Sequence, residues 1–296
     1  MTTMTAATIP ARTGARKPRR QRNWGRWIGV AFLLLWTLIP IYWTLNTSLQ
    51  TDAQVSARPA NYLPPTPSLQ NYLTLLAGDG ETAESIRASI ANIMVECVAA
   101  TVVTVLLSTL AAYAFARMRF RGRQALFYAV LATMAFPAYT TLIPLYKIMT
   151  WLGLVNTYAG IVLVYVSGFL PLATWILYNY MSSLPRAIEE AAQIDGASRL
   201  QVLWHVVVPL ARPGIVSTAI ITFLFAWGQF LFPLVLSSDI STEPLTVVIA
   251  ALQGRHTVPF SLMSAAGVLA IAIPAIVALV LNRYIVNGLL AGSVKS

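Results

Sequence analysis

The sequence predicts an all-α polytopic membrane protein with six transmembrane helices. Of its 296 residues, 57% are hydrophobic and only 10% are charged, whereas a soluble domain carries about 25% charged residues. The apolar residues form long uncharged runs rather than alternating or amphipathic patterns, which is typical of helices that cross a bilayer. The Lys and Arg residues lie mainly at the ends of these runs, so the net charge of +10 indicates membrane topology rather than a nucleic-acid surface.

Each predicted span is long enough to cross the membrane, because about 20 residues at 1.5 Å each cover a hydrocarbon core of about 30 Å. Charged residues separate the spans, which we place near 26–48, 90–116, 124–146, 157–180, 210–236 and 261–285. We expect residues 26–296 to form one transmembrane domain.

The chain begins with a basic segment, residues 1–25, that we expect to be a cytoplasmic tail. Seven Lys and Arg residues lie within the first 26 positions. The uncharged run that follows, from Trp27 to Thr51, is too long for the apolar region of a signal peptide and has no small-x-small cleavage site. We therefore expect this run to remain as a membrane anchor.

The distribution of Lys and Arg predicts that both termini face the cytoplasm. In that orientation sixteen basic residues lie inside and four lie outside, in agreement with the positive-inside rule. Those inside are the seven of the tail and Arg117, Arg119, Arg121, Arg123, Arg186, Arg199, Arg212, Arg283 and Lys295. Those outside are Arg58, Arg87, Lys147 and Arg255.

The first outside loop, residues 49–89, is predicted to have little regular structure. It contains four prolines, at positions 59, 64, 65 and 67, and the polar stretch from Gly78 to Glu81. Proline cannot donate a backbone hydrogen bond and glycine relaxes the chain, so both residue types favour irregular structure.

The segment between the fourth and fifth spans, residues 184–209, is too polar to lie in the membrane. Pro185 suits the first turn of a helix, and the acids that follow suit the positive end of its dipole. Gly196 can adopt a left-handed turn that ends this first helix. A second short helix from Arg199 to Val207 is closed by Pro209. We expect a helix-turn-helix at the cytoplasmic face.

This segment resembles the cytoplasmic "EAA" loop of binding-protein-dependent ABC importer permeases. Glu190-Ala191-Ala192 is followed after three residues by Gly196 and, after nine more, by Val-Val-Val-Pro209, where the family prefers Ile-x-Leu-Pro. Further similarity lies in Ala112-Tyr-Ala-Phe-Ala-Arg117, Phe120-Arg-Gly-Arg123, Trp227-Gly-Gln-Phe-Leu-Phe-Pro233 and Arg283-Tyr-Ile-Val-Asn-Gly-Leu-Leu-Ala-Gly292. The chain is similar over most of residues 25–296 to the shorter, maltose-G-type permeases of carbohydrate importers.

The resemblance implies a transport subunit in a bacterial inner membrane rather than an enzyme. Its partners would be a second, related permease, two copies of an ABC ATPase and an extracytoplasmic sugar-binding protein. The expected solute is a di- or oligosaccharide. ATP and Mg would be bound by the ATPase partners. The residues implied in ATPase coupling are Glu190, Ala191, Ala192, Asp195, Gly196 and Pro209. The alternative for the loop is a capped surface helix with solvated acids.

Two polar residues of the second span are candidates for the substrate path. Glu96 is the only Asp, Glu, Lys, Arg or His residue between Arg87 and Arg117, and Asn92 lies one helical turn earlier. Intramembrane acids are costly and usually face a partner or a water-filled path. Glu96 therefore either contacts the solute or makes a structural hydrogen bond to a neighbouring helix.

The fifth span carries three more candidates for the substrate path, Trp227, Gln229 and Phe230. Aromatic faces stack on the C–H faces of sugar rings, and amides bond their hydroxyls. Gly228 and Pro233 would permit close packing and a kink. Packing at a subunit interface explains the same residues equally well.

No catalytic, cofactor or metal site is expected in this chain. The two histidines, His205 and His256, fall on opposite sides of the membrane in the predicted topology, so they cannot share a metal or a catalytic role. Cys97 is the single cysteine, and the sequence contains no GxxxxGK[ST] phosphate loop. A secondary carrier, a membrane-embedded enzyme and an ABC permease for a non-sugar solute are the remaining alternatives.

Overall fold

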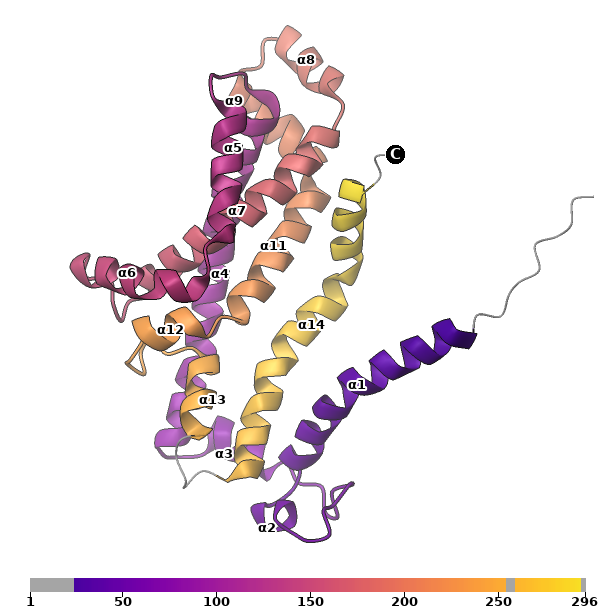
Figure 1. The fold of residues 1–296 in the computed structure, drawn as a ribbon, viewed down its shortest axis with the longest axis vertical. Helices are drawn as coiled ribbons and strands as arrows, with labels where there is room; N and C mark the ends of the chain where they lie inside the picture. The colour runs from indigo at the N-terminus through magenta and orange to yellow at the C-terminus, as the bar shows by residue number, and fades with distance from the viewer. Residues whose placement is uncertain (1–23, 254–258, 294–296) are drawn as a thin grey trace, which may run out of the picture. The chain divides into compact units, whose positions relative to one another are not determined.

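The computed structural model describes residues 24–253 and 259–293 (Figure 1). Most of the predicted basic tail, together with Arg255, His256 and Lys295, lies outside the described residues. The chain divides into two units, the smaller ending at Trp43 and the larger beginning at Thr44. Within the described residues all regular structure is helical.

Helix α1, Trp24–Ser48, contains all of the smaller unit's described residues and continues into the larger unit. It has 25 residues and contains an 18-residue stretch with a mean hydropathy of 1.9, enough in length and composition to cross a membrane. It coincides with the first predicted span, 26–48, to within two residues.

The larger unit contains thirteen further α-helices and two short segments of other helix types in its described part. These elements are α2 Asp52–Val55, α3 Gln70–Ala77, α4 Glu81–Arg117, α5 Arg123–Ala132, the 3₁₀ segment η1 Thr133–Ala135, α6 Ala138–Trp151, α7 Tyr158–Ser183, α8 Arg186–Ile194, α9 Arg199–Val202, the π segment η2 Leu203–Val207, α10 Val208–Leu210, α11 Arg212–Trp227, α12 Leu231–Leu236, α13 Leu245–Gln253 and α14 Phe260–Ser293.

Four of the described helices, α1, α4, α7 and α14, are long and apolar enough to cross a membrane, and two bent helix pairs raise the count to as many as six. Helix α4 begins at Glu81, well before the predicted start of the second span at 90. Glu81 and Glu84 occupy its first turn, where negative charge stabilises a helix N-terminus.

The segment of the predicted third span, 124–146, is not a single straight helix. It is divided into α5 with η1 and α6, which meet at an angle of 100°. The break falls at Phe136, which is extended with φ −73° and ψ 123°, and at Pro137, the N-cap of α6. Proline disfavours a helical conformation of the residue before it, so Phe136 cannot continue the helix.

The segment of the predicted fifth span, 210–236, is also not one continuous helix. The segment before it, Arg199–Leu210, bends by 77° into α11. At the other end α11 stops at Trp227, and the chain turns through Gly228 to Phe230 before the short helix α12 begins at Leu231.

The first outside loop has more regular structure than its prolines predict. Thr51 caps α2 in a capping box with Gln54, and α3 follows within the same loop. The Asn71 side-chain amide donates hydrogen bonds to the carbonyls of Ser48 (2.8 Å) and Gln50 (2.9 Å). These contacts hold α3 against the end of α1 and give the loop a fixed shape.

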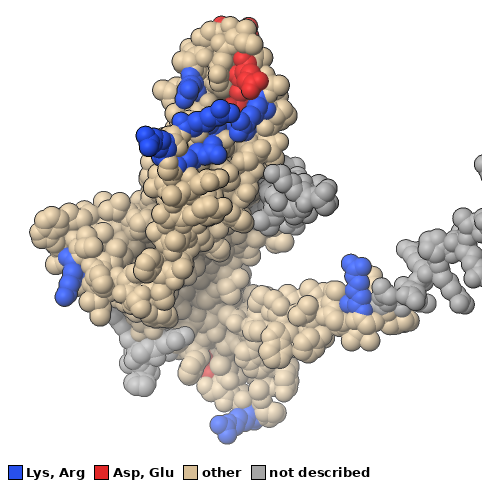
Figure 2. Space-filling view, turned by 45° about the horizontal axis from the view of Figure 1, so that its top comes forward, with Lys and Arg blue, Asp and Glu red and all other residues tan. Residues whose placement is uncertain are grey.

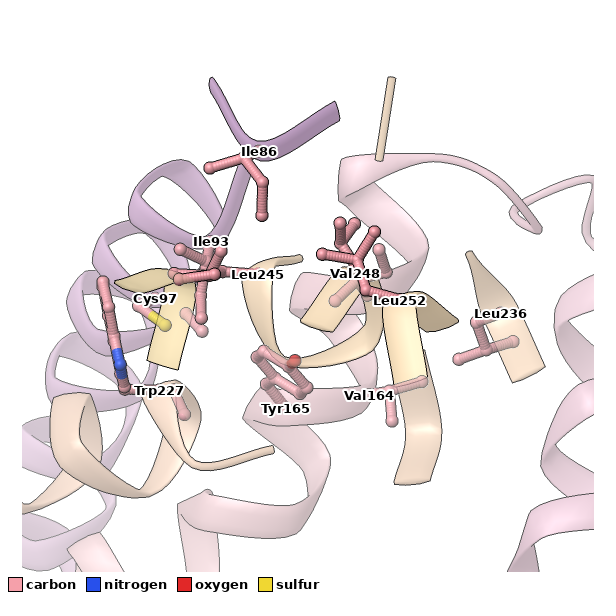
Figure 3. Close-up of a cluster of buried hydrophobic side chains, with 14 of the residues drawn as sticks. Ile86, Ile93, Cys97, Val164, Tyr165, Trp227, Leu236, Leu245, Val248 and Leu252 are labelled. Carbon is pink, nitrogen blue, oxygen red and sulfur yellow. The ribbon is translucent and has the colours of Figure 1, made fainter. Parts of the chain in front are cut away.

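Two buried clusters hold the larger unit together. The first includes Ile93, Tyr165, Trp227 and Leu245 and joins α4, α7, α11 and α13 (Figure 3). The second lies toward the opposite end of α4 and packs side chains of α4 and α7, such as Leu177, against the α9 to α10 region. Helices α4 and α7 run through both clusters, so they mechanically connect the two ends of the molecule.

Candidate functional site

Helix α8 ends in a tight turn whose geometry favours glycine. Gly196 has φ +89°, a left-handed conformation that residues with a Cβ rarely adopt. Its N–H donates to the carbonyl of Gln193 (3.1 Å), and the N–H of Ala197 donates to that of Ala192 (3.0 Å). This pair of bonds is the Schellman motif, which satisfies carbonyls at a helix end.

The second helix of the loop starts immediately after this turn. Ser198 caps α9 and forms a capping box with Gln201, so the turn between α8 and α9 is hydrogen-bonded on both sides. The chain then passes through η2 and reaches Pro209 in α10, just before the 77° bend into α11. The predicted helix-turn-helix over 184–209 is therefore present in the fold.

A buried ion pair anchors α8 to the end of α4. Arg117 Nε donates to Glu189 Oε1 at 2.6 Å, and both side chains are only 7% exposed. Arg117 Nη2 also donates to the carbonyl of Leu184 (2.9 Å), and Arg186 Nη2 donates to that of Ala116 (3.3 Å). Hydrogen bonds from arginine side chains to a carboxylate and to backbone carbonyls therefore connect the end of α4 with the start of α8.

The sequence analysis did not identify Glu189 and Arg117 as functional residues. Its candidate acid was Glu190, which is exposed, while Glu189 beside it is buried. The spacing could have indicated that Glu189 faces inward, because Glu189 and Ala192 are three residues apart and share one face of α8. That face packs toward the protein, whereas Glu190 lies on the other side.

The outward surface of the loop combines apolar and acidic side chains. Ile194 is 86% exposed and Leu200 is 63% exposed. Among the sequence-predicted coupling residues, Glu190, Ala191, Asp195 and Pro209 are exposed at this end, and Ala192 is half-buried against the second cluster. Exposed apolar side chains outside the spanning helices mark a surface suited to another protein.

Basic residues gather at the same end of the molecule as α8 (Figure 2). Arg117 ends α4 and Arg123 begins α5, with Arg119 and Arg121 in the turn between them. Acidic side chains, drawn red, lie in the same region (Figure 2). Acidic loop and arginine-rich helix ends therefore lie side by side.

Asn92 is engaged by other parts of the protein. Its Nδ2 donates to the carbonyls of Ile240 (2.9 Å) and Glu243 (3.0 Å), and its Oδ1 accepts from the hydroxyl of Tyr158 (2.7 Å). Both amide N–H groups are used in this conformation. Asn92 thus connects α4 to α7 and to the segment before α13, and a role in the substrate path stays a prediction.

Glu96 lies one turn further along α4 and is completely buried, with 0% exposure. Neither carboxylate oxygen has a hydrogen-bond partner within the described residues, and the same holds for the hydroxyl of Tyr165 in the neighbouring helix α7. A buried polar group without a partner is costly. The conformation therefore leaves Glu96 poised to bond a group that it does not contact here.

The three candidates of the fifth span occupy different environments. Trp227 is 4% exposed, and its indole Nε1 donates to the carbonyl of Ala270 in α14 (3.0 Å). The carbonyl of Gln229 accepts from the hydroxyl of Thr246 (2.8 Å), and Phe230 is 39% exposed. Trp227 and Cys97, the residue that follows Glu96, both belong to the first cluster (Figure 3).

The two groups of candidates are far apart. Asn92 and Arg117 are both on α4, and 25 residues of α-helix extend about 37 Å. The coupling residues and the path residues are thus separate sites joined by one helix. Within residues 24–253 and 259–293, no three His, Cys, Asp or Glu side chains are grouped so that they could hold a metal ion.

Several long apolar helices, two bent helix pairs and a capped polar loop at one end are the features of a polytopic membrane protein. Comparison with known families gives the same result, because the family described as "Binding-protein-dependent transport system inner membrane component" matches residues 80–290. The chain belongs to this family. The family predicted from the sequence is thereby confirmed.

Relatives of known assignment match almost the whole chain. The sulfoquinovosyl glycerol transport system permease protein SmoH of Agrobacterium fabrum is 35% identical over 270 residues, covering 91% of this chain and 93% of the relative. The trehalose/maltose transport system permease protein MalG of Thermococcus litoralis is 35% identical over 269 residues, covering 90% and 95%.

A solved structure has the same fold over nearly its full length. It is a chain of a bacterial ABC transporter involved in the import of the acidic polysaccharide alginate, with a TM-score of 0.76 and 26% identity. The match covers 92% of this chain and 99% of that one. The bent and broken helices described above thus belong to a fold that ABC transporters use.

Proposed function

We propose that this chain is the permease subunit of an ATP-driven sugar importer, in which it forms half of the translocation pathway and transmits ATPase motion through the α8 to α10 loop. The observation that carries this proposal is the loop itself. Its outward face is apolar and acidic, while its inward face is bonded to α4 through Glu189 and Arg117.

The loop has the properties of a rigid lever. The Schellman turn at Gly196 and the capping box at Ser198 limit its internal motion. A force applied to the exposed Ile194 would pass through the ion pair into α4 and through the 77° bend into α11. Both helices contribute to the first buried cluster, so motion at the loop reaches the centre of the molecule.

The proposed docking partner is an ABC ATPase. Ile194 and Leu200 would enter a cleft on it, and Glu190 and Asp195 would pair with its basic residues. Two ATPase copies would bind ATP and Mg, and a second, related permease would complete the pathway. An extracytoplasmic binding protein would deliver the solute to the opposite end of the subunit.

The proposed topology has six spans with both termini in the cytoplasm. It requires each bent helix pair to cross the bilayer as one broken span. The arginines at the ends of α4 and α5 lie at the same end of the larger unit as α8, and α14 also ends there (Figure 1), which supports a cytoplasmic position for this end. Residues 1–25 would be a cytoplasmic tail and 26–296 the transmembrane domain.

The names of the relatives support a sugar as the transported solute. Their names give sulfoquinovosyl glycerol and trehalose or maltose, and the structural relative takes part in the import of the polysaccharide alginate. A di- or oligosaccharide is accordingly the proposed solute. Trp227 and Phe230 could supply aromatic faces to it, and Glu96 and Asn92 hydrogen bonds, if the first cluster opens during transport.

Reconstitution tests the proposal. The chain would be co-expressed with candidate ATPase, second-permease and binding-protein subunits sought among the neighbouring genes, and ATP-dependent uptake of radiolabelled maltose and trehalose into proteoliposomes would be measured. Ile194→Asp should abolish ATPase retention, whereas Ile240→Asp, an equivalent change at the other end of the molecule, should not. Equal retention in both variants would contradict docking at the loop, and ATP-dependent uptake of non-sugar solutes alone would contradict the sugar class.

A further inference from the structure

A pocket lined by four arginines lies where α4 ends and α5 begins. Arg117 and Arg119 come from the end of α4 and the turn after it, Arg123 from the start of α5, and Arg186 from the start of α8. The lining contains no acidic residue. Figure 2 shows basic side chains gathered at one end of the molecule.

The positive charge of this pocket is largely uncompensated. Arg117 is paired with Glu189. Among the described residues, Arg123 Nη1 donates to the carbonyl of Met118 (3.2 Å) and Arg186 Nη2 to that of Ala116 (3.3 Å), and neutral carbonyls do not cancel a charge. Arg119 forms no hydrogen bond or ion pair with the described residues and is exposed. Converging like charges favour binding of an anion.

Arginine geometry and the adjoining backbone suit a phosphate group. Arg presents a planar fork of donors that binds phosphate oxygens in pairs. The lining also includes Gln124 and Ala125 in the first turn of α5, where the N-cap Gly122 has no side chain to accept their N–H groups. The arginines supply the charge, and these amides add donors.

The pocket is continuous with an apolar surface. Phe120 lines it and is 41% exposed, and on α5 the side chains of Leu126 and Tyr128 are 51% and 66% exposed. Helix α5 is the first half of a candidate membrane span. A ligand with a phosphate at one end and hydrocarbon at the other would therefore contact both surfaces at once.

We propose that this arginine pocket binds the headgroup of an anionic phospholipid, whose acyl chains lie along the exposed face of α5. Because Arg117 and Arg186 also hold α8 in place, a bound lipid would lie directly beside the coupling loop. Binding depends only on the membrane lipid and this chain, so it does not rest on which solute is transported.

Native mass spectrometry of the full chain in detergent tests the proposal, with added phosphatidylglycerol or phosphatidylcholine. Arg119→Gln removes a charge from the pocket. Arg121→Gln removes the same charge from the same turn, but Arg121 is outside the lining. We expect phosphatidylglycerol to be retained by the wild type and by Arg121→Gln, and its affinity to fall about fivefold in Arg119→Gln. Arg119→Lys should recover part of the loss.

Four outcomes would overturn the proposal. Equal losses in Arg119→Gln and Arg121→Gln would indicate general surface charge rather than a pocket. Equal retention of phosphatidylcholine would remove the requirement for an anionic headgroup. Displacement of the lipid by millimolar inorganic phosphate would indicate a free-anion site. Loss of ATPase association in Arg119→Gln with unchanged lipid binding would assign the pocket to the protein partner.

Discussion

Arg117 and Glu189 join the last residue of α4 to the first turn of α8 through a 2.6 Å bond between Nε and Oε1. The two residues are separated by 72 positions, and both side chains are 7% exposed. An ion pair in such an environment is not necessarily stabilising in total, because desolvation offsets the attraction. It does, however, specify one position of the loop relative to the helix that connects it with the first cluster.

Removing one partner of this pair should destabilise the protein and weaken coupling. Glu189→Ala leaves a buried guanidinium without its carboxylate, a change that costs about 3–5 kcal/mol in comparable cases. We expect a lower unfolding temperature in detergent and reduced solute-stimulated ATP hydrolysis in the complex. Glu190→Ala is the control for stability, since an exposed substitution usually changes it by less than about 0.5 kcal/mol. Equal unfolding temperatures for both variants would show that the pair is not a structural anchor.

Gly196 should tolerate asparagine but not valine. The φ of +89° is the constraint, because a Cβ built at this position meets no atom within 4 Å. Asparagine visits the left-handed region far more readily than a β-branched residue. Gly196→Val should cost about 1–3 kcal/mol locally and reduce transport while the protein still inserts into the membrane. Wild-type import by Gly196→Val in the assembled complex would argue against a rigid lever.

The loop should be inaccessible from outside the cell. A cysteine at the exposed Gln193, in a Cys97→Ala background, should react with an impermeant maleimide in inverted vesicles and not in intact cells. A cysteine at the exposed Asp79 in the first outside loop should show the reverse pattern. Labelling at position 193 in intact cells would refute the proposed orientation.

Glu96 should matter for transport more than for assembly. Its carboxylate has no partner in the described structure, so an apolar residue of similar volume should fill the site without loss of folding. We expect Glu96→Met to reach the membrane at normal abundance and to assemble, while uptake falls. Glu96→Ala should also lower uptake, but it leaves a cavity as well. Unchanged uptake in Glu96→Met would assign the residue a packing role only.

Much of this architecture follows from local properties of the sequence. The long apolar helices α1, α4, α7 and α14 were predicted because length and hydropathy within one segment decide whether it can cross a bilayer. The break at Pro137 was not predicted, although proline biases the preceding residue away from the helix. In membrane proteins neighbouring helices can also keep such a helix continuous, so proline alone does not determine the outcome.

The candidate site likewise combines features that the local sequence predicts with features that only tertiary packing decides. The turn at Gly196 could be predicted because glycine, helix formers and a capping serine act within a few residues of one another. The sequence by itself determined the helical segments, the asymmetry of the basic residues and the position of the polar loop. The tertiary structure alone decided that Glu189 rather than Glu190 is buried, that it pairs with Arg117, and that Asn92 is already occupied. Those outcomes depend on how distant helices pack together, and packing brings together residues whose separation in sequence carries no information about their distance in space.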